Sequence, residues 1–307
     1  MEYSLKGQFK KIYEVTTPTQ FFCMIITFML AFYFPFILEV SKDYTRYRKL
    51  ERPDYSYESI NDFWMVIPIC LALRVLKMLI DYYSKDYFTR NLKYKYSGND
   101  LEQKVEKCLR GIFKVIFFFT TFSLGLFQVL MNTNFCPSFM GGSGNHLLTI
   151  GNYPYTPMPN GLKFYYMLSI SYYIQDGIEH IFMTPKFDFW EMILHHVITS
   201  LLLFSSYMNG LWIIGAHILP MMDFEDIWIG LIRAFMDCGN RIVIIVTYGM
   251  IMTSWIYLRF FVSTYVILIS FSFTSRVTID NNFNLCLANT ILLFILQGLN
   301  IYWFILL

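Results

Sequence analysis

The sequence predicts an all-α polytopic membrane protein with about eight transmembrane helices, and three observations lead to that fold class. Of the 307 residues, 56% are hydrophobic and 15% are charged, whereas a soluble domain carries about a quarter charged residues. The apolar residues gather in runs of about 20, the length of a helix that crosses roughly 30 Å of hydrocarbon. Backbone groups in lipid must bond within the protein, so these runs are expected to be helices.

The expected helices follow one another along the chain. The seventh is long enough to tilt strongly or to break. We divide the chain into an N-terminal region, residues 1–104, with two helices and basic loops, and a six-helix membrane domain, residues 105–307. The expected helices cover residues 19–40, 62–82, 111–132, 161–183, 190–208, 211–235, 241–271 and 283–306.

The three longest water-facing segments differ in charge. Segment 83–110 is rich in lysine and arginine, whereas segment 133–160 has neither. Positive residues favour the inner side of a membrane, which places 83–110 and both termini inside, although the basic segment 41–61 argues the opposite. The glycines of 133–160 lack the Lys-Ser/Thr of a phosphate loop, so we expect a cap over the membrane domain there.

Composition also excludes several classes of function. The net charge is +2, and no isolated basic stripe suggests a nucleic-acid partner. The six cysteines are scattered without metal-like or redox-like spacing and are expected to be structural. The first apolar run is too long for a cleavable signal peptide. The last expected helix ends close to Leu307, so we expect no soluble tail after it.

Ionisable residues inside the expected helices mark the candidate site, because buried charge in a membrane is costly and tends to be functional. Four of the five histidines fall in these helices, together with a dense group of carboxylates. The group consists of Asp176, Glu179, His180, Glu191, His195, His196, His217, Asp223, Glu225 and Asp226.

Helical spacing sorts these residues into faces. Asp176 and His180 are four residues apart and share one face of the fourth helix. Glu191, His195 and Thr199 form one line along the fifth helix.

The sixth helix brings its own carboxylates. Antiparallel packing of the fifth and sixth helices is expected to place His195 and His196 opposite Asp223 and Asp226. A carboxylate beside an imidazole fixes its tautomer and raises its basicity, so the pattern predicts a site for proton transfer.

Other interpretations of the same residues stay open. Buried His–Asp pairs can tie helices together by hydrogen bonds alone. A single zinc ion held by His195, His196 and an aspartate is a further alternative, although we predict no metal. A di-iron centre of the hydroxylase type needs more imidazoles than this chain offers.

The stretch from Lys186 to Thr199, with its His-His pair and a threonine three residues later, resembles the TLC family of TRAM-like and Lag1-like ceramide synthase proteins. The resemblance extends over roughly 105–307. Further matches are the Tyr-Pro loop at Asn152-Tyr153-Pro154, Lys163 at the start of the next helix, Gly215, Asp223, Asp226, the intramembrane Arg259 and the last-helix stretch 296–303.

One position departs from the family pattern. Met222 stands where ceramide synthases have the histidine of a His-Asp pair, and a methionine cannot carry a proton. His217 is five residues earlier, with Pro220 between, and so points elsewhere unless the helix is kinked. Glu225 is closer in direction.

The resemblance implies N-acylation of a long-chain amine by acyl-CoA, a co-substrate rather than a bound cofactor. His195 and His196 would act as general base or transient acyl carrier, with Asp223 and Asp226 orienting them. The implied supporting residues are Glu191, Thr199, Asp176, His180, Glu225 and Arg259, and the basic residues for the CoA phosphates are Lys163, Lys186 and Arg233.

Met222 favours an alternative, a non-catalytic TLC-fold protein that binds lipid or serves as a structural subunit of a larger membrane complex. A lipid transporter or sensor is a third hypothesis. The expected partners are membrane lipids, acyl-CoA and a long-chain amine, or other subunits. The resemblance implies the endoplasmic reticulum, whereas the subunit hypothesis leaves the mitochondrial inner membrane or another organelle membrane open.

Overall fold

The computed structural model describes residues 17–54, 57–131, 153, 155, 158–183, 188–239, 241–276 and 283–307. Within these ranges the secondary structure is helical and no strand occurs. The elements are α2 (Pro18–Glu51), η1 (Ile60–Met65), α3 (Val66–Leu92), α4 (Gly98–Met131), α6 (Asn160–Phe182), α7 (Phe189–Met208), α8 (Trp212–Phe235), η4 (Met236–Cys238), α9 (Arg241–Ser254), η5 (Trp255–Val262), α10 (Ser263–Arg276) and α11 (Phe283–Leu306).

Each expected helix is present, and the predicted all-α polytopic membrane protein is confirmed. In the described part of the chain, six helical segments are long and apolar enough to cross a membrane. Helices α6 and α8 do not belong to this set, and they carry many of the polar residues of the candidate site. Burial inside the bundle compensates for their lower hydropathy, because their polar faces meet protein instead of lipid.

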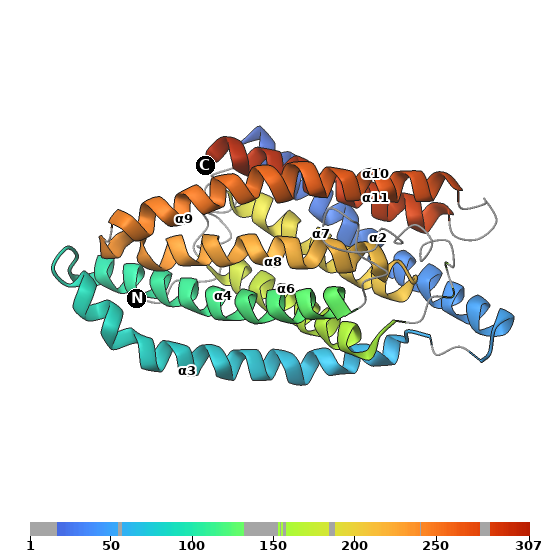
Figure 1. Cartoon of the computed structure of the whole chain (residues 1–307), viewed down its shortest axis with the longest axis horizontal. Coiled ribbons are helices and arrows are strands. Elements are labelled where there is room, and N and C mark those ends of the chain that lie inside the picture. Colours follow the sequence, from blue (N-terminus) through green and yellow to red (C-terminus); the bar gives the residue numbers. More distant parts are fainter. Residues whose placement is uncertain are drawn as a thin grey trace.

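The helices form an elongated bundle (Figure 1). Helix α3 lies at one edge, and α10 and α11 lie side by side at the opposite edge. Helix α4 packs along α8, and the two N-terminal helices pack on the outside, α2 against α7 and α3 against α4 and α6. The apolar windows of α2 and α3 are only 11% and 6% buried, against 61% for α7, so α7 is central and the other two offer their surfaces to lipid.

The seventh expected helix neither breaks nor stays regular. Between α9 and α10 the chain widens into the π-helical segment η5, which contains Arg259. Insertions of this kind disturb the backbone hydrogen-bond ladder and occur often at functional sites. Here the Gln297 side chain of α11 donates to the Arg259 carbonyl at 2.7 Å, so a neighbouring helix stabilises the irregular turn.

The contact between α4 and α8 depends on two glycines. A Cβ atom on Gly111 would lie 2.7 Å from the Ala234 nitrogen and 2.9 Å from the Gly230 oxygen. A Cβ atom on Gly230 would lie 3.1 Å from the Gly111 oxygen. Small residues let membrane helices approach closely and gain packing energy, so this pair sets the distance between the two helices.

We therefore expect Gly111→Ala to lower the free energy of unfolding by about 1–3 kcal/mol, the usual cost of overpacking. Intrinsic helix propensity alone would predict a gain of about 1 kcal/mol for the same change. Gly249→Ala in α9 is the matched control, because nothing lies within 4 Å of its Cβ position. Denaturant unfolding of both variants in detergent measures the difference, and equal stabilities would contradict a close α4–α8 contact.

Candidate functional site

Two cavities lie inside the bundle and meet at its centre. The first presents mainly apolar atoms to its interior, with polar side chains at its two ends, and has an empty volume of about 770 Å³. It is narrow. The second is wider, with an empty volume of about 1470 Å³, and its lining includes Lys107, Lys114 and Arg233.

The two cavities share four lining residues, which are Tyr173, His195, Asp226 and Arg259. They come from α6, α7, α8 and η5. The junction is therefore the place where a basic, polar chamber meets an apolar slot. An amphipathic ligand with an anionic head and a single hydrocarbon chain would place the link between its two parts at this point.

Arg259 is the most constrained charge at the junction. Its Nε donates to Glu225 Oε2 at 2.6 Å, and its two remaining nitrogens reach Asp226 Oδ1 at 3.1 Å and Asn300 Oδ1 at 2.9 Å. The guanidinium also lies 4.4 Å from the centre of the Trp255 ring. These contacts from α8, α11 and η5 satisfy a cation that the membrane interior would otherwise strongly disfavour.

The histidine pair has a different carboxylate partner from the one that the sequence predicted. Asp176 Oδ2 of α6 lies 3.6 Å from His196 Nε2 and 2.9 Å from Lys114 Nζ. A Lys–Asp–His arrangement therefore runs from α4 through α6 to α7. His195 is packed by rings, with Trp303 at 5.4 Å between ring centres, and its buried Nδ1 has no hydrogen-bond partner.

The two aspartates of α8 have partners other than the histidines. Asp223 accepts a hydrogen bond from the Tyr165 hydroxyl at 2.6 Å and lines neither cavity. Asp226 lines both cavities but is paired with Arg259. The predicted direct pairing of Asp223 and Asp226 with the histidines is thus replaced by the Asp176 contact, because α6 supplies the face that packs on His196.

Of the remaining predicted residues on α6 and α7, some line a cavity and others do not. Thr199 lines the apolar cavity and donates to the His195 carbonyl at 2.8 Å. The His180 ring lies 6.1 Å from the His196 ring and stacks on Phe189, so it supports the pair without lining a cavity. Glu191, one helical turn before His195 on α7, is buried, interacts with Tyr302 and lines neither cavity.

The candidate substitutes for the missing histidine do not take its place. Met222 lines the wall of the apolar cavity. His217 Nδ1 bonds the Ile213 carbonyl at 2.7 Å, and neither His217 nor Glu225 lines a cavity.

Of the basic residues predicted to meet phosphates, only Arg233 lines the polar cavity. Lys163 is bound to Asp62 Oδ1 at 2.7 Å and lines neither cavity. Lys186 lies outside the described residues, as does most of the 133–160 segment that we expected to form a cap.

Lys114 and Asn300 are functional candidates that the sequence analysis missed, and Tyr173 is a third. A lysine near the start of the expected helix 111–132 was the available signal, since intramembrane cations usually have a role. Tyr173 and Asn300 gave no such signal, because tyrosine and asparagine are common in packed helices. In the ranges that the structure covers, no three His, Cys, Asp or Glu side chains are grouped closely enough to hold a metal ion.

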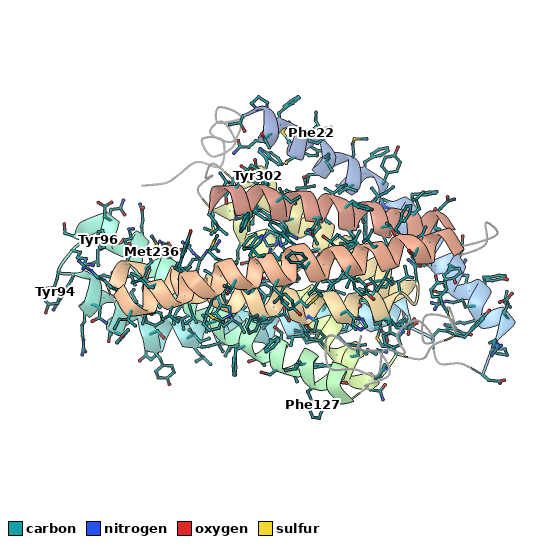
Figure 2. The ribbon with its side chains drawn as sticks, turned by 45° about the horizontal axis from the view of Figure 1, so that its top comes forward. Phe22, Tyr94, Tyr96, Phe127, Met236 and Tyr302 are labelled. Atoms are coloured by element: carbon teal, nitrogen blue, oxygen red, sulfur yellow. The ribbon has the colours of Figure 1, made fainter. Side chains whose placement is uncertain are left out.

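The polar cavity lies toward the basic end of the bundle, where Tyr96 and Met236 are found (Figure 2). There Asp237 of η4 accepts from Lys104 at 2.9 Å and from Lys107 at 3.1 Å. Burial of the Asp237 carboxylate opposes its ionisation, but the hydrogen bonds from the two lysines outweigh it and hold its pKa below the ordinary value. This cluster fixes α4 to the end of α8 beside the cavity.

Together, the apolar helices and the histidine-lined junction define an integral membrane protein with two adjoining internal cavities. A family model of the TLC domain matches residues 106–307. The chain therefore belongs to the TLC-domain family, and the resemblance seen in the sequence is confirmed.

Curated relatives carry the names of acyltransferases. Ceramide synthase hyl-2 of Caenorhabditis elegans is 26% identical over 194 residues, 60% of this chain and 55% of the relative. Sphingosine N-acyltransferase lac1 of Schizosaccharomyces pombe is 30% identical over 168 residues, 50% of this chain and 43% of the relative. Ceramide synthase LOH1 of Arabidopsis thaliana is 27% identical over 212 residues, 66% of each. The chain spans about half the length of the first two.

We expect Arg259→Met to lower the free energy of unfolding by about 3–5 kcal/mol, because it leaves the buried Glu225 without its cation. Arg46→Met is the matched control. The Arg46–Asp43 pair is 78% and 73% exposed, and such pairs contribute less than about 1 kcal/mol. Denaturant unfolding compares the two variants, and similar losses would show that Arg259 does not hold the junction together.

We also expect the stabilisation from Asp237 to depend on pH in one direction. Because its folded-state pKa is lowered, the contribution is complete above the unfolded value of about 3.9 and is lost as the pH falls through the folded value. The difference in unfolding free energy between wild type and Asp237→Asn should thus be constant from about pH 5 to about pH 8 and shrink below about pH 4. A difference that grows on acidification would contradict the assignment.

Proposed function

We propose that this protein is a ceramide synthase-like N-acyltransferase, which joins a fatty acyl group from acyl-CoA to a long-chain amine within the membrane. The observation that carries the proposal is the position of His195, between a basic polar cavity and a narrow apolar one. Acyl-CoA has the matching division, with phosphates on one side of its thioester and a hydrocarbon chain on the other. The names of the curated relatives support the same chemistry.

The six-helix region carries the whole proposed site. Every described residue that lines the two cavities falls between Lys107 and Leu307. The phosphates of CoA would meet Lys107, Lys114 and Arg233 in the polar cavity. We propose that residues 105–307 form the acyltransferase unit and that residues 1–104 flank it through α2 and α3.

The reaction requires two proton transfers, one from the amine to a base and one from that base to the departing sulfur. The amine nitrogen attacks the thioester carbon, a C–N bond forms, and the C–S bond breaks to release the CoA thiolate. His195 is placed to take the proton that the amine loses and to return it to the departing sulfur. Formation of an acyl-imidazole on the same ring, followed by attack of the amine, is the covalent form of this route.

Neighbouring charges would support the imidazole. Asp176 lies next to His196 and is held by Lys114, so we assign it the orienting role that we had expected for Asp223 and Asp226. Arg259 beside the junction would favour negative charge on the thioester oxygen in the transition state. By family resemblance, we propose the endoplasmic reticulum as the location of this integral membrane protein.

A second candidate function rests on Met222. Its thioether occupies the cavity wall where ceramide synthases have a histidine, and neither His217 nor Glu225 lines a cavity. A protein that binds a lipid chain without transferring it, alone or as a subunit of a membrane complex, would keep the apolar cavity and could lose this proton carrier.

An acyl-transfer assay on the purified protein tests the proposal. The wild type is incubated with a panel of acyl-CoA chain lengths and a long-chain amine, and products are identified by mass spectrometry. We expect product from wild type and a loss of at least about 10²-fold in His195→Ala, the usual contribution of a general base. His217→Ala is the matched control, because this buried histidine lines neither cavity, and it should remain active.

Met222→His separates the two candidate functions. Product from this variant but not from wild type would show a disabled enzyme on an intact scaffold. Absence of product from both, with folded protein and co-purifying lipid, would sink the acyltransferase proposal and favour the lipid-binding one.

A further inference from the structure

The four helical walls of the apolar cavity carry lining residues at two common levels, and of the described lining residues Leu211, just before α8, lies beyond the lower level. At the junction, Arg259 binds Asp226 and Asn300, so η5, α8 and α11 are in register there. At the far end, Asn289 Nδ2 donates to Ser205 Oγ at 2.8 Å, which aligns α11 with α7. These bonds fix both ends of the cavity.

Eleven residues separate the two levels on every wall. The pairs of lining residues are His195 and Ser206 on α7, Asp226 and Gly215 on α8, Arg259 and Ser270 on η5 and α10, and Asn300 and Asn289 on α11. Eleven residues of α-helix rise about 16 Å. Between these two levels the slot is therefore about 16 Å deep along the α-helical walls α7, α8 and α11.

The far end is polar and lies against buried aromatic side chains. Tyr166 and Trp212, which lie behind it, are fully buried, and the Tyr166 hydroxyl donates to the Trp212 carbonyl at 3.0 Å. Ser206, Ser270 and Asn289 face the slot from this floor. Asn289 is 95% buried, and its Oδ1 has no hydrogen-bond partner.

This floor disfavours a longer hydrocarbon chain for two reasons. On the α8 side the buried Tyr166 packs directly behind the floor, because a Cβ atom added to Gly215 would collide with its hydroxyl. A methyl group pressed against Asn289 Oδ1 would also keep that buried acceptor unsatisfied. Between junction and floor the wall consists of apolar side chains such as Leu202, Ile218 and Leu293.

From this geometry we propose that the slot selects an acyl chain of about fourteen carbons, which ends at the Ser206–Ser270–Asn289 floor. An extended chain advances roughly 1.2 Å per bond, as the polypeptide backbone does, so about 16 Å holds about thirteen bonds. The inference rests on the proposed function for the identity of the ligand, but the depth of the slot does not depend on turnover.

The test measures binding of unreactive S-alkyl-CoA thioethers to the purified full chain. With chains from about 8 to about 24 carbons, affinity should rise roughly fourfold per added methylene until about fourteen carbons and then stop rising or fall. An affinity that keeps rising toward the longest chains would overturn the proposal.

A substitution halfway down the slot should move that limit. Leu293 lies seven residues from Asn300, or about 10 Å below the junction. Leu293→Trp should shift the limit to about nine carbons. Ile291→Trp is the matched control on the same helix, because Ile291 is 49% exposed on the outer surface, and its limit should stay at about fourteen carbons.

A substitution on a second wall of the slot provides the same test in case the first variant does not fold. Leu202 of α7 is also seven residues from its junction residue, His195, and lines the same slot, so Leu202→Trp should give the same shortened limit. Unchanged limits in both slot variants would overturn the proposal.

Turnover separates this inference from the acyltransferase proposal. A limit at about fourteen carbons in the binding series without any acyl transfer would leave the slot assignment standing and refute only the transfer step. Acyl transfer with a preferred chain of about twenty-four carbons would refute the slot assignment and leave the transfer step intact.

Discussion

The structure depends on how the membrane interior accommodates Arg259. A guanidinium at this depth is tolerated only with full compensation, and here Glu225, Asp226 and Asn300 provide it. Because these partners come from α8 and α11, the single cation fixes the relative positions of three helical segments. The π-helical turn that contains Arg259 is in turn held by Gln297.

That arrangement explains why a polar and an apolar cavity can exist side by side. The buried Arg259–Asp226 pair lies where the two cavities meet, and His195 lines both cavities at the same place. On one side Arg233 and the Lys114–Asp176 ion pair line the wider cavity. On the other side leucine and isoleucine side chains give a slot from which anionic groups are excluded by their desolvation cost.

The close α4–α8 contact and the Asp237 cluster serve the same site from outside it. Gly111 and Gly230 bring the two helices together, and Asp237 joins their ends through Lys104 and Lys107. Helix α4 is thereby held where Lys114 can reach Asp176 on α6. Asp176, which lies beside His196, is thus positioned by packing that begins about two helical turns away.

The sequence by itself determined the membrane class, the place of each long helix and the residues worth attention, because hydropathy and helical periodicity are local properties. It placed His195, His196 and Arg259 in the candidate site. It did not determine which carboxylate meets which base: Asp223 turned out to bind Tyr165, and Asp176 to approach His196. Periodicity says which face of a helix a residue occupies, but only tertiary packing decides which helix lies opposite that face. The depth of the apolar slot was hidden for the same reason, since its walls come from four segments far apart in the chain.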